Sequence, residues 1–114
     1  MTLAKKYRLG QRKGIKGRFG PSPKIRGSFF FIQVASNDLS YGRARIIVPL
    51  KVSKKATYRN KVRRLVSQII KEHGLTNRAI DMVVNISPAI VDKTPGEIKS
   101  ELDETIKKAF VNKG

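Results

Sequence analysis

The stretch from residue 56 to residue 74 constrains the fold most, because as a helix it has two chemically different faces. Residues three or four positions apart lie on the same side of a helix, and here that spacing gathers one aliphatic stripe. The stripe comprises Val62, Leu65, Val66, Ile69 and Ile70. The opposite face is basic and comprises Asn60, Arg63, Arg64, Ser67 and Lys71, with Arg59 and Lys61 at its borders. We therefore expect a helix that packs onto a core with one side and presents cations with the other.

The ends of this helix are also marked in the sequence. Thr57, or else Ser53, is suited to the N-cap, because a hydroxyl oxygen accepts a hydrogen bond from the backbone N–H groups of the first turn. Gly74 follows the last turn and favours a stop there. His73 is the only histidine, and at the end of a helix we expect it to interact with the helix dipole and the last carbonyl groups.

The distribution of charge indicates the kind of partner. The 114 residues carry a formal net charge of +17, which for a chain of one domain favours a polyanion, and nucleic acid before membrane. Residues 1–71 contain 19 Lys and Arg and a single acid, Asp38, whereas residues 72–114 contain 6 Lys and Arg and 7 acids. The polyanion should therefore bind the first two thirds of the chain.

Composition also excludes several classes of protein. The chain has no cysteine, so disulfides and thiolate metal sites are excluded and a reducing compartment fits. No apolar run approaches the roughly 20 residues of a membrane span, and the N-terminus lacks the apolar segment of a signal peptide. We expect a cytoplasmic protein without a membrane partner.

Residues 1–27 are basic and rich in glycine. Ile15 and Phe19 are four apart and share a face if this segment is helical, but its interior glycines each cost a helix about 1 kcal/mol relative to alanine. We expect a short or frayed helix near residues 8–19, then an extended connection at Pro21 and Pro23. The alternative is a disordered basic arm.

Three further segments have the composition of strands. Residues 28–35 and 43–48 are aromatic or β-branched and are separated by turn residues, which predicts a hairpin that ends at Pro49. Residues 80–86 form a short apolar run between loops, typical of a buried strand.

A second amphipathic helix should follow at residue 95. Thr94 is placed as N-cap, Pro95 as the first helical residue and Glu97 as the partner that closes a capping box. Its apolar stripe comprises Ile98, Leu102, Ile106, Ala109 and Phe110. The element order predicts an α+β sandwich, with helices on one face of a sheet and the other face available to a partner.

Catalytic chemistry by the chain itself has little support. Glu97, Glu101 and Glu104 have helical spacing and could form a metal or catalytic cluster, but lysines interleave with them, which favours a solvated face. These lysines are Lys93, Lys99, Lys107 and Lys108. No nucleotide-binding loop and no zinc spacing occurs, so we assign no catalytic and no metal-binding residue.

The chain has more residues suited to RNA binding than to catalysis. Arg63 and Arg64 can grip phosphate through two parallel hydrogen bonds, and Asn60 can bond to phosphate, sugar or a base edge. Along a strand Phe29 and Phe31 point to one side and Phe30 to the other, so at least one ring should face away from the helices. Such a ring can stack on an unpaired base; the alternative is that all three pack in the core.

The stretch 51–65 resembles the protein subunit of bacterial ribonuclease P. That family has an Arg-Asn-Arg motif followed by an apolar and two basic residues, after a strand that ends near Ser-Lys-Lys. Here the motif is Ser53-Lys54-Lys55 and then Arg59-Asn60-Lys61-Val62-Arg63-Arg64. Lys61 keeps the positive charge of the arginine that is the third motif residue, but it lacks the planar guanidinium group that can form two parallel hydrogen bonds. The resemblance extends over Tyr7-Arg8-Leu9, Ile15 with Phe19, Asp81-Met82-Val83-Val84 with Pro88, and Glu97 to Ala109.

The resemblance implies a fold and a function. The fold is an α-β-β-β-α-β-α sandwich like domain 2 of ribosomal protein S5, with helices on one face of a four-stranded sheet and a left-handed βαβ crossover, rare by the usual rule. The whole chain, 1–114, would be one such domain, with any disorder at residues 1–7 and 111–114. The function is that of a ribonuclease P subunit, which assists removal of the 5′ leader from precursor tRNA.

The resemblance also implies partners and site residues. The chain would bind ribonuclease P RNA and precursor tRNA and need no protein partner; the RNA subunit would catalyse with Mg²⁺, while the protein alone would be inactive and bind no cofactor. The motif helix would contact RNA through Lys54, Lys55, Arg59, Asn60, Lys61, Arg63, Arg64, Ser67 and Lys71. The leader cleft would comprise Lys13, Ile15, Lys16, Arg18, Phe19, Phe29, Phe30, Phe31 and Gln33. The alternative is a structural RNA-binding protein of the same fold without a substrate role.

Overall fold

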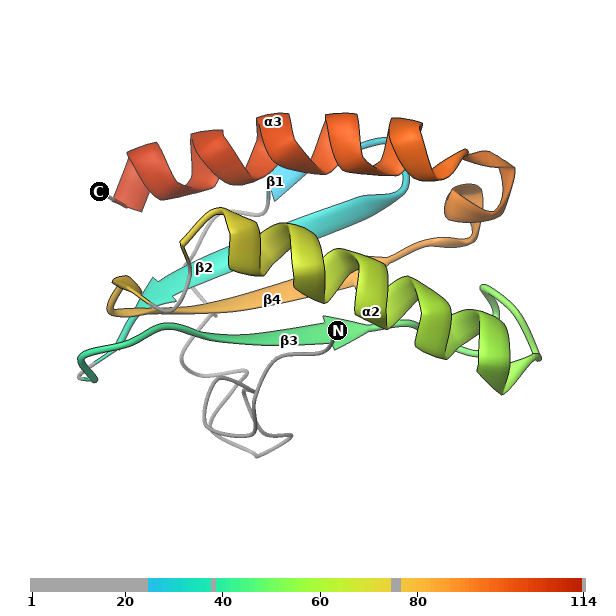
Figure 1. The fold of residues 1–114 in the computed structure, drawn as a ribbon, viewed down its shortest axis with the longest axis horizontal. Coiled ribbons are helices and arrows are strands. Elements are labelled where there is room, and N and C mark those ends of the chain that lie inside the picture. The colour runs from blue at the N-terminus through green and yellow to red at the C-terminus, as the bar shows by residue number, and fades with distance from the viewer. Residues whose placement is uncertain (1–24, 38, 75–76, 114) are drawn as a thin grey trace.

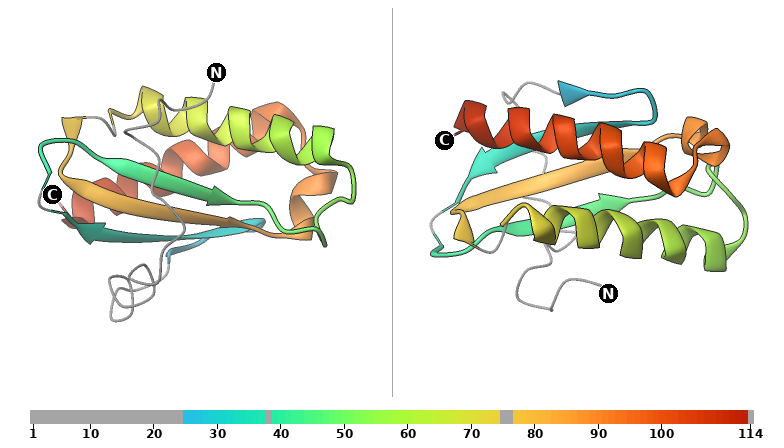
Figure 2. Two further views of the ribbon diagram at one scale, coloured as in Figure 1. Left: turned by 90° about the horizontal axis from the view of Figure 1, so that it is seen from below. Right: turned by 45° about the horizontal axis from the view of Figure 1, so that its top comes forward.

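The computed structural model describes residues 25–37, 39–74 and 77–113, and the side chains as far as residue 109. Two layers make up this part of the chain: a four-stranded sheet, and two long helices that lie together on one of its faces (Figures 1 and 2). The first helix expected near residues 8–19 lies outside the described residues. Among the residues described, no helix is long and apolar enough to cross a membrane.

The sheet has the order β1-β2-β4-β3. The strands are β1 (Ile25–Arg26), β2 (Phe30–Ser36), β3 (Arg43–Ile47) and β4 (Ile80–Ile86). β4 pairs antiparallel with β2 and parallel with β3. The predicted hairpin of residues 28–35 and 43–48 is therefore wrong, although both strands exist. β4 has six of its seven residues buried, so it gains most from an inner position and separates the two strands that are neighbours in sequence.

The helices are α2 (Ala56–Glu72), the short 3₁₀ helix η3 (Pro88–Asp92) and α3 (Pro95–Lys113). α2 connects the adjacent parallel strands β3 and β4 across the helical face of the sheet. In Figure 1, with α2 in front, the chain passes from β3 to β4 in the left-handed sense. The family resemblance implied this crossover, and the described part of the chain confirms it.

α2 and α3 bury the core between themselves and the sheet. Val62, Val66, Ile69 and Ile70 of α2 are buried, as predicted. Leu65 is only partly buried, and Ser67, which was placed on the basic face, is only 5% exposed. α2 contacts α3 as well as the sheet, so its buried arc is wider than a single stripe and extends toward Ser67.

α3 begins with the predicted capping box. The Thr94 N–H donates to Glu97 Oε1 over 2.8 Å, and the Glu97 N–H donates to Thr94 Oγ1 over 3.2 Å. The bond from the Thr94 backbone lowers the pKa of Glu97, because it stabilises the ionised carboxylate. The predicted stripe Ile98, Leu102, Ile106 and Ala109 is buried.

The predicted N-cap of α2 is wrong. Lys55 occupies the N-cap position without a side-chain bond to the first turn, and Ser53 Oγ accepts a hydrogen bond from the Lys55 N–H instead. The C-terminal prediction is confirmed, since α2 ends before His73 and Gly74 follows with a φ of 79°.

His73 also joins the two helices. Its Nε2 lies 2.7 Å from Asp103 Oδ1 of α3. Lys99 of α3 extends this contact, because its ammonium group bonds to both Asp103 and Glu72. The side chain of the only histidine thus bonds to the neighbouring helix, a contact that the prediction of an interaction with the last carbonyls of α2 did not include.

The orientation of α2 predicts different costs for two truncations. Ile70 is 0% exposed, so Ile70→Ala should lower the free energy of unfolding by about 2–5 kcal/mol through lost burial and the cavity left behind. Leu65→Ala removes the same number of heavy atoms at a partly exposed position and should cost less. Urea denaturation of both variants measures the difference, and an equal loss would mean that α2 is rotated away from the orientation described.

Candidate nucleic-acid interface

The first candidate surface is the outer face of α2 with the loop before it, which we call the motif surface. Its exposed members are Lys54, Lys55, Asn60, Lys61, Arg64 and Lys71, and its partly exposed members are Arg59 and Arg63. No acid occurs between residues 56 and 71 to neutralise them. Such a surface attracts a polyanion in a salt-dependent way.

Hydrogen bonds hold part of the motif surface in place. Arg63 Nη1 donates to Asn60 Oδ1 over 2.9 Å, one helical turn away. Arg59 Nη1 donates over 2.8 Å to the carbonyl oxygen of Ser53, which ties the helix to the loop that carries Lys54 and Lys55. Two motif arginines are thus oriented before any ligand binds, and each guanidinium keeps further N–H donors for phosphate.

The structure corrects one residue of the RNA-binding set that was predicted from the sequence. Ser67 was predicted to contact RNA, but at 5% exposure it lies in the interior. Lys61 and Arg64 have neither hydrogen bond nor ion pair within the described ranges, and both are exposed, so their positive charges are available to a ligand.

The second candidate surface is the sheet face that α2 and α3 leave uncovered, which we call the open face. Directly paired residues of neighbouring strands share a face. Phe31 of β2 pairs with Arg26 of β1 on one side and with Asn85 of β4 on the other. The Arg26 guanidinium carbon lies 5.7 Å from the centre of the Phe31 ring, which is a cation–π contact.

Only one of the three consecutive phenylalanines belongs to the open face. Phe29 and Phe30 are 0% and 4% exposed, lie in the core and meet edge to face with ring centres 4.7 Å apart. Their assignment to the leader cleft is corrected. Phe29 precedes the first residue of β2, so strand alternation does not apply to it and its ring packs inward beside Phe30. Phe31 and Gln33 are partly exposed.

Arg43 on the open face is already neutralised. Its Nε and Nη2 donate to the two oxygens of Asp81, over 2.9 and 2.8 Å, and Asn37 Nδ2 donates to the same carboxylate. Asp81 is 0% exposed, and its hydrogen bond raises the pKa of Arg43. The pair satisfies a buried charge and so belongs to the fold.

The remaining cleft residues of the sequence prediction lie outside the described residues: Lys13, Ile15, Lys16, Arg18 and Phe19. Sequence reasoning also missed residues that the sheet register brings to the open face. These are Arg26, Arg45 and Asn85. The alternation of Arg43, Ala44 and Arg45 could have placed both arginines on one face, but the wrong hairpin hid which strands lie beside them.

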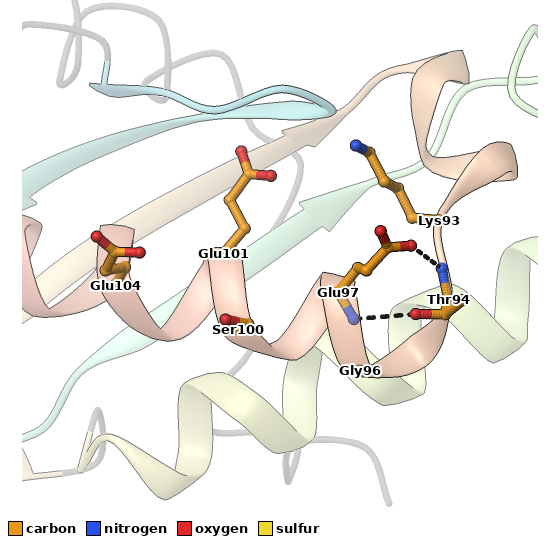
Figure 3. A pocket seen from close by; sticks show the side chains of 7 residues that line it. All are labelled: Lys93, Thr94, Gly96, Glu97, Ser100, Glu101 and Glu104. Atoms are coloured by element: carbon orange, nitrogen blue, oxygen red, sulfur yellow. Dashed lines mark hydrogen bonds between the residues drawn. The ribbon is translucent and has the colours of Figure 1, made fainter.

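The acidic row of α3 borders an open groove of about 630 Å³ on the helical layer (Figure 3). Glu97 is engaged in the capping box, and Glu101 accepts hydrogen bonds from the N–H and hydroxyl of Ser28. Glu104 is exposed. No group of three or more residues with metal-binding side chains occurs within the described ranges.

A two-layer α+β sandwich that carries a basic helix, with no acid before its last residue, and an open sheet face with arginine and phenylalanine defines an RNA-binding protein. A family model described as Ribonuclease P matches residues 3–110. The chain therefore belongs to the ribonuclease P protein family. Its role is that of a protein component of ribonuclease P in tRNA processing, as part of an endoribonuclease complex.

Individual relatives agree with this assignment. The ribonuclease P protein component of Thioalkalivibrio sulfidiphilus is 26% identical over 96 residues, which cover 84% of this chain and 80% of the relative. That of Legionella pneumophila is 27% identical over 107 residues, which cover 94% and 92%.

Solved structures support the same fold. A mutant ribonuclease P protein of Staphylococcus aureus, with defective mRNA degradation activity, superposes with a TM-score of 0.81 at 24% identity, covering 92% of this chain and 89% of the other. The ribonuclease P protein of Thermotoga maritima gives 0.75 at 24% identity, with coverages of 89% and 96%.

The free cations of the motif surface predict a separation of binding from stability. Arg64→Ala should weaken binding to ribonuclease P RNA by about 1–3 kcal/mol and reduce the salt slope by about one, because one phosphate contact is lost. Its melting temperature should hardly change, since Arg64 is exposed.

The matched control is Lys108→Ala, which removes one exposed charge from α3. Titration of the RNA at several salt concentrations measures both variants. Equal loss of affinity in the two would mean that net charge alone, and not the motif surface, determines binding.

Proposed function

We propose that this chain binds ribonuclease P RNA through the motif surface and holds the single-stranded 5′ leader of precursor tRNA on the open face. The observation that carries the proposal is the cation–π contact of Arg26 with Phe31 on the open face, which is the side of the sheet opposite α2 and α3. Unpaired bases stack on aromatic rings and on guanidinium planes, whereas duplex RNA offers no exposed base face.

The proposal leaves catalysis to the RNA subunit with its Mg²⁺. Covalent catalysis by a side chain of the protein would need a base in contact with a nucleophile, and the only histidine bonds to Asp103 between two helices. The acids of α3 lie on the helical layer, whereas the strand register assigns Phe31 to the open face. We therefore expect the protein to act by binding the substrate. We place this role in the cytoplasm, without an obligate protein partner and without a membrane.

The competing function is a structural RNA-binding protein of the ribosomal S5-like fold, which would organise RNA without handling a substrate. It predicts contacts by the motif surface alone. The family assignment and the stacking platform on the open face favour the substrate-binding role.

Reconstitution with the cognate ribonuclease P RNA tests the proposal. The protein should restore cleavage of precursor tRNA at low magnesium, and the protein without RNA should leave the precursor uncut. A structural protein would bind the RNA and fail to lower the magnesium requirement. Cleavage by the protein alone would contradict the assignment of catalysis to the RNA.

The open face predicts an effect that depends on the leader. Phe31→Ala should weaken binding of precursor tRNA to the reconstituted enzyme by about 1–3 kcal/mol, the range for one stacking contact, and leave mature tRNA binding unchanged. Only the precursor carries a leader to stack.

A control is Val91→Ala on η3, which removes an apolar side chain of 53% exposure on neither surface. Equilibrium binding of both tRNAs to each variant gives the comparison. Equal weakening for precursor and mature tRNA would place Phe31 against the catalytic RNA or the tRNA body.

A further inference from the structure

Arg43 and Arg45 lie two residues apart on β3 and therefore on the same face of the sheet. Between them, Ala44 is buried in the core under the helices, so both arginines belong to the open face. They differ in what the register places opposite them. Arg43 pairs with Asp81 of β4, and Arg45 pairs with Val83.

This difference separates a structural arginine from an available one. Arg43 is bound by both oxygens of the buried Asp81 carboxylate. Arg45 has neither hydrogen bond nor ion pair in the part of the chain that the structure describes, and its cross-strand neighbour Val83 is apolar. Val83 packs with Ala35 and Ile47 in a small apolar cluster on this face. A cation beside apolar surface, with no acid to neutralise it, is the combination that a single strand of RNA requires.

We propose that Arg45 binds a backbone phosphate of the single-stranded leader and so extends the leader site across the whole sheet, from β1 to β3. The inference rests on the proposed function and adds a second contact point to it. Arg26 on Phe31 holds a base at one edge of the sheet, and Arg45 holds a phosphate at the other. A guanidinium suits this task because its planar fork forms two parallel hydrogen bonds with phosphate.

The register gives the length of leader that reaches both points. β1 and β3 are separated by three strand spacings of about 4.8 Å, or about 14 Å. Arg45 also lies one row, about 6.6 Å along the strand, from the row of Arg26 and Phe31, which makes the separation about 16 Å. A stacked strand advances about 3.4 Å along its axis for each nucleotide, so about five nucleotides span the two points. A leader of about two nucleotides should reach only one of these two contact points.

The test compares Arg45→Gln with Arg45→Lys in the enzyme reconstituted with ribonuclease P RNA. Glutamine keeps part of the aliphatic stem while removing the charge, and lysine keeps the charge while removing the planar guanidinium group. The control is Lys107→Gln, which removes one exposed charge from α3. Affinity is measured for precursors with leaders of about two and about eight nucleotides, and for mature tRNA.

The expected result is a leader-length effect. Arg45→Gln should weaken binding of the long-leader precursor about tenfold, the loss for one charged hydrogen-bonding contact, and leave the short-leader precursor and mature tRNA unchanged. Arg45→Lys should recover part of that loss. Lys107→Gln should change the affinity for all three RNAs by the same factor. Thermal melting of each protein identifies any variant that lost its fold, and Arg45→Lys then provides the comparison.

Two outcomes would overturn the inference. Equal weakening for long and short leaders would place Arg45 against the tRNA body or the catalytic RNA, and unchanged binding of all three RNAs would mean that Arg45 contacts none. Phe31→Ala in the same assay separates this failure from that of the proposed function. If Phe31→Ala shows a leader effect and Arg45→Gln does not, only the second contact point is wrong; if neither does, the leader site itself is wrong.

Discussion

The insertion of β4 between β2 and β3 is the constraint on which the rest of the structure depends. β4 is buried over nearly its whole length, so the chain must carry it to the middle of the sheet, and α2 provides the crossover. That crossover brings the basic helix onto the same layer as α3 (Figure 2), and neither of these two helices covers the other sheet face. It also places Asp81 opposite Arg43 and leaves Arg45 opposite Val83. The positions of both candidate surfaces thus follow from one strand pairing.

Most acids of the chain form hydrogen bonds or ion pairs within the fold. Most of the cations therefore have no acidic partner in the chain and can bind a ligand. Five of the eight acids hold elements together: Glu72, Asp81, Glu97, Glu101 and Asp103. Their partners are backbone N–H groups, a hydroxyl, two side-chain amides, His73 and two cations, Arg43 of β3 and Lys99 of α3. Since the 25 Lys and Arg outnumber these partners several times over, most of the positive charge has no internal counterpart. The fold is therefore stable at high net charge only with the repulsion spread over a wide surface, and a polyanion relieves that repulsion on binding.

Local patterns in the sequence predicted local structure correctly, but they could not predict which strands pair with one another. The capping box of α3, the end of α2 at Gly74 and strand 80–86 each depend on residues within one turn or one run, and each is confirmed. The hairpin prediction failed because proximity in sequence says nothing about β4, which follows only after α2 and is inserted between the two strands. The family resemblance supplied the four-stranded fold that periodicity could not. At the site, Ser67 was misplaced because a helical wheel assumes one buried stripe, while α2 packs against two elements.

The motif surface also explains how the chain tolerates Lys61 at a position where the family has arginine. Lys61 is exposed, so its charge remains available to a ligand even though it cannot bind phosphate with two parallel bonds. The guanidinium groups of this surface belong to Arg59, Arg63 and Arg64. Two of these are oriented in advance, by the Ser53 carbonyl and by Asn60, so less side-chain entropy is lost when they bind phosphate. Arg64 has no such restraint from the residues that the structure describes, so a phosphate that it binds would have to order its side chain. Loss of the Asn60 amide should therefore weaken the contact made by Arg63 more than that made by Arg64, although both lie on the same turn of α2.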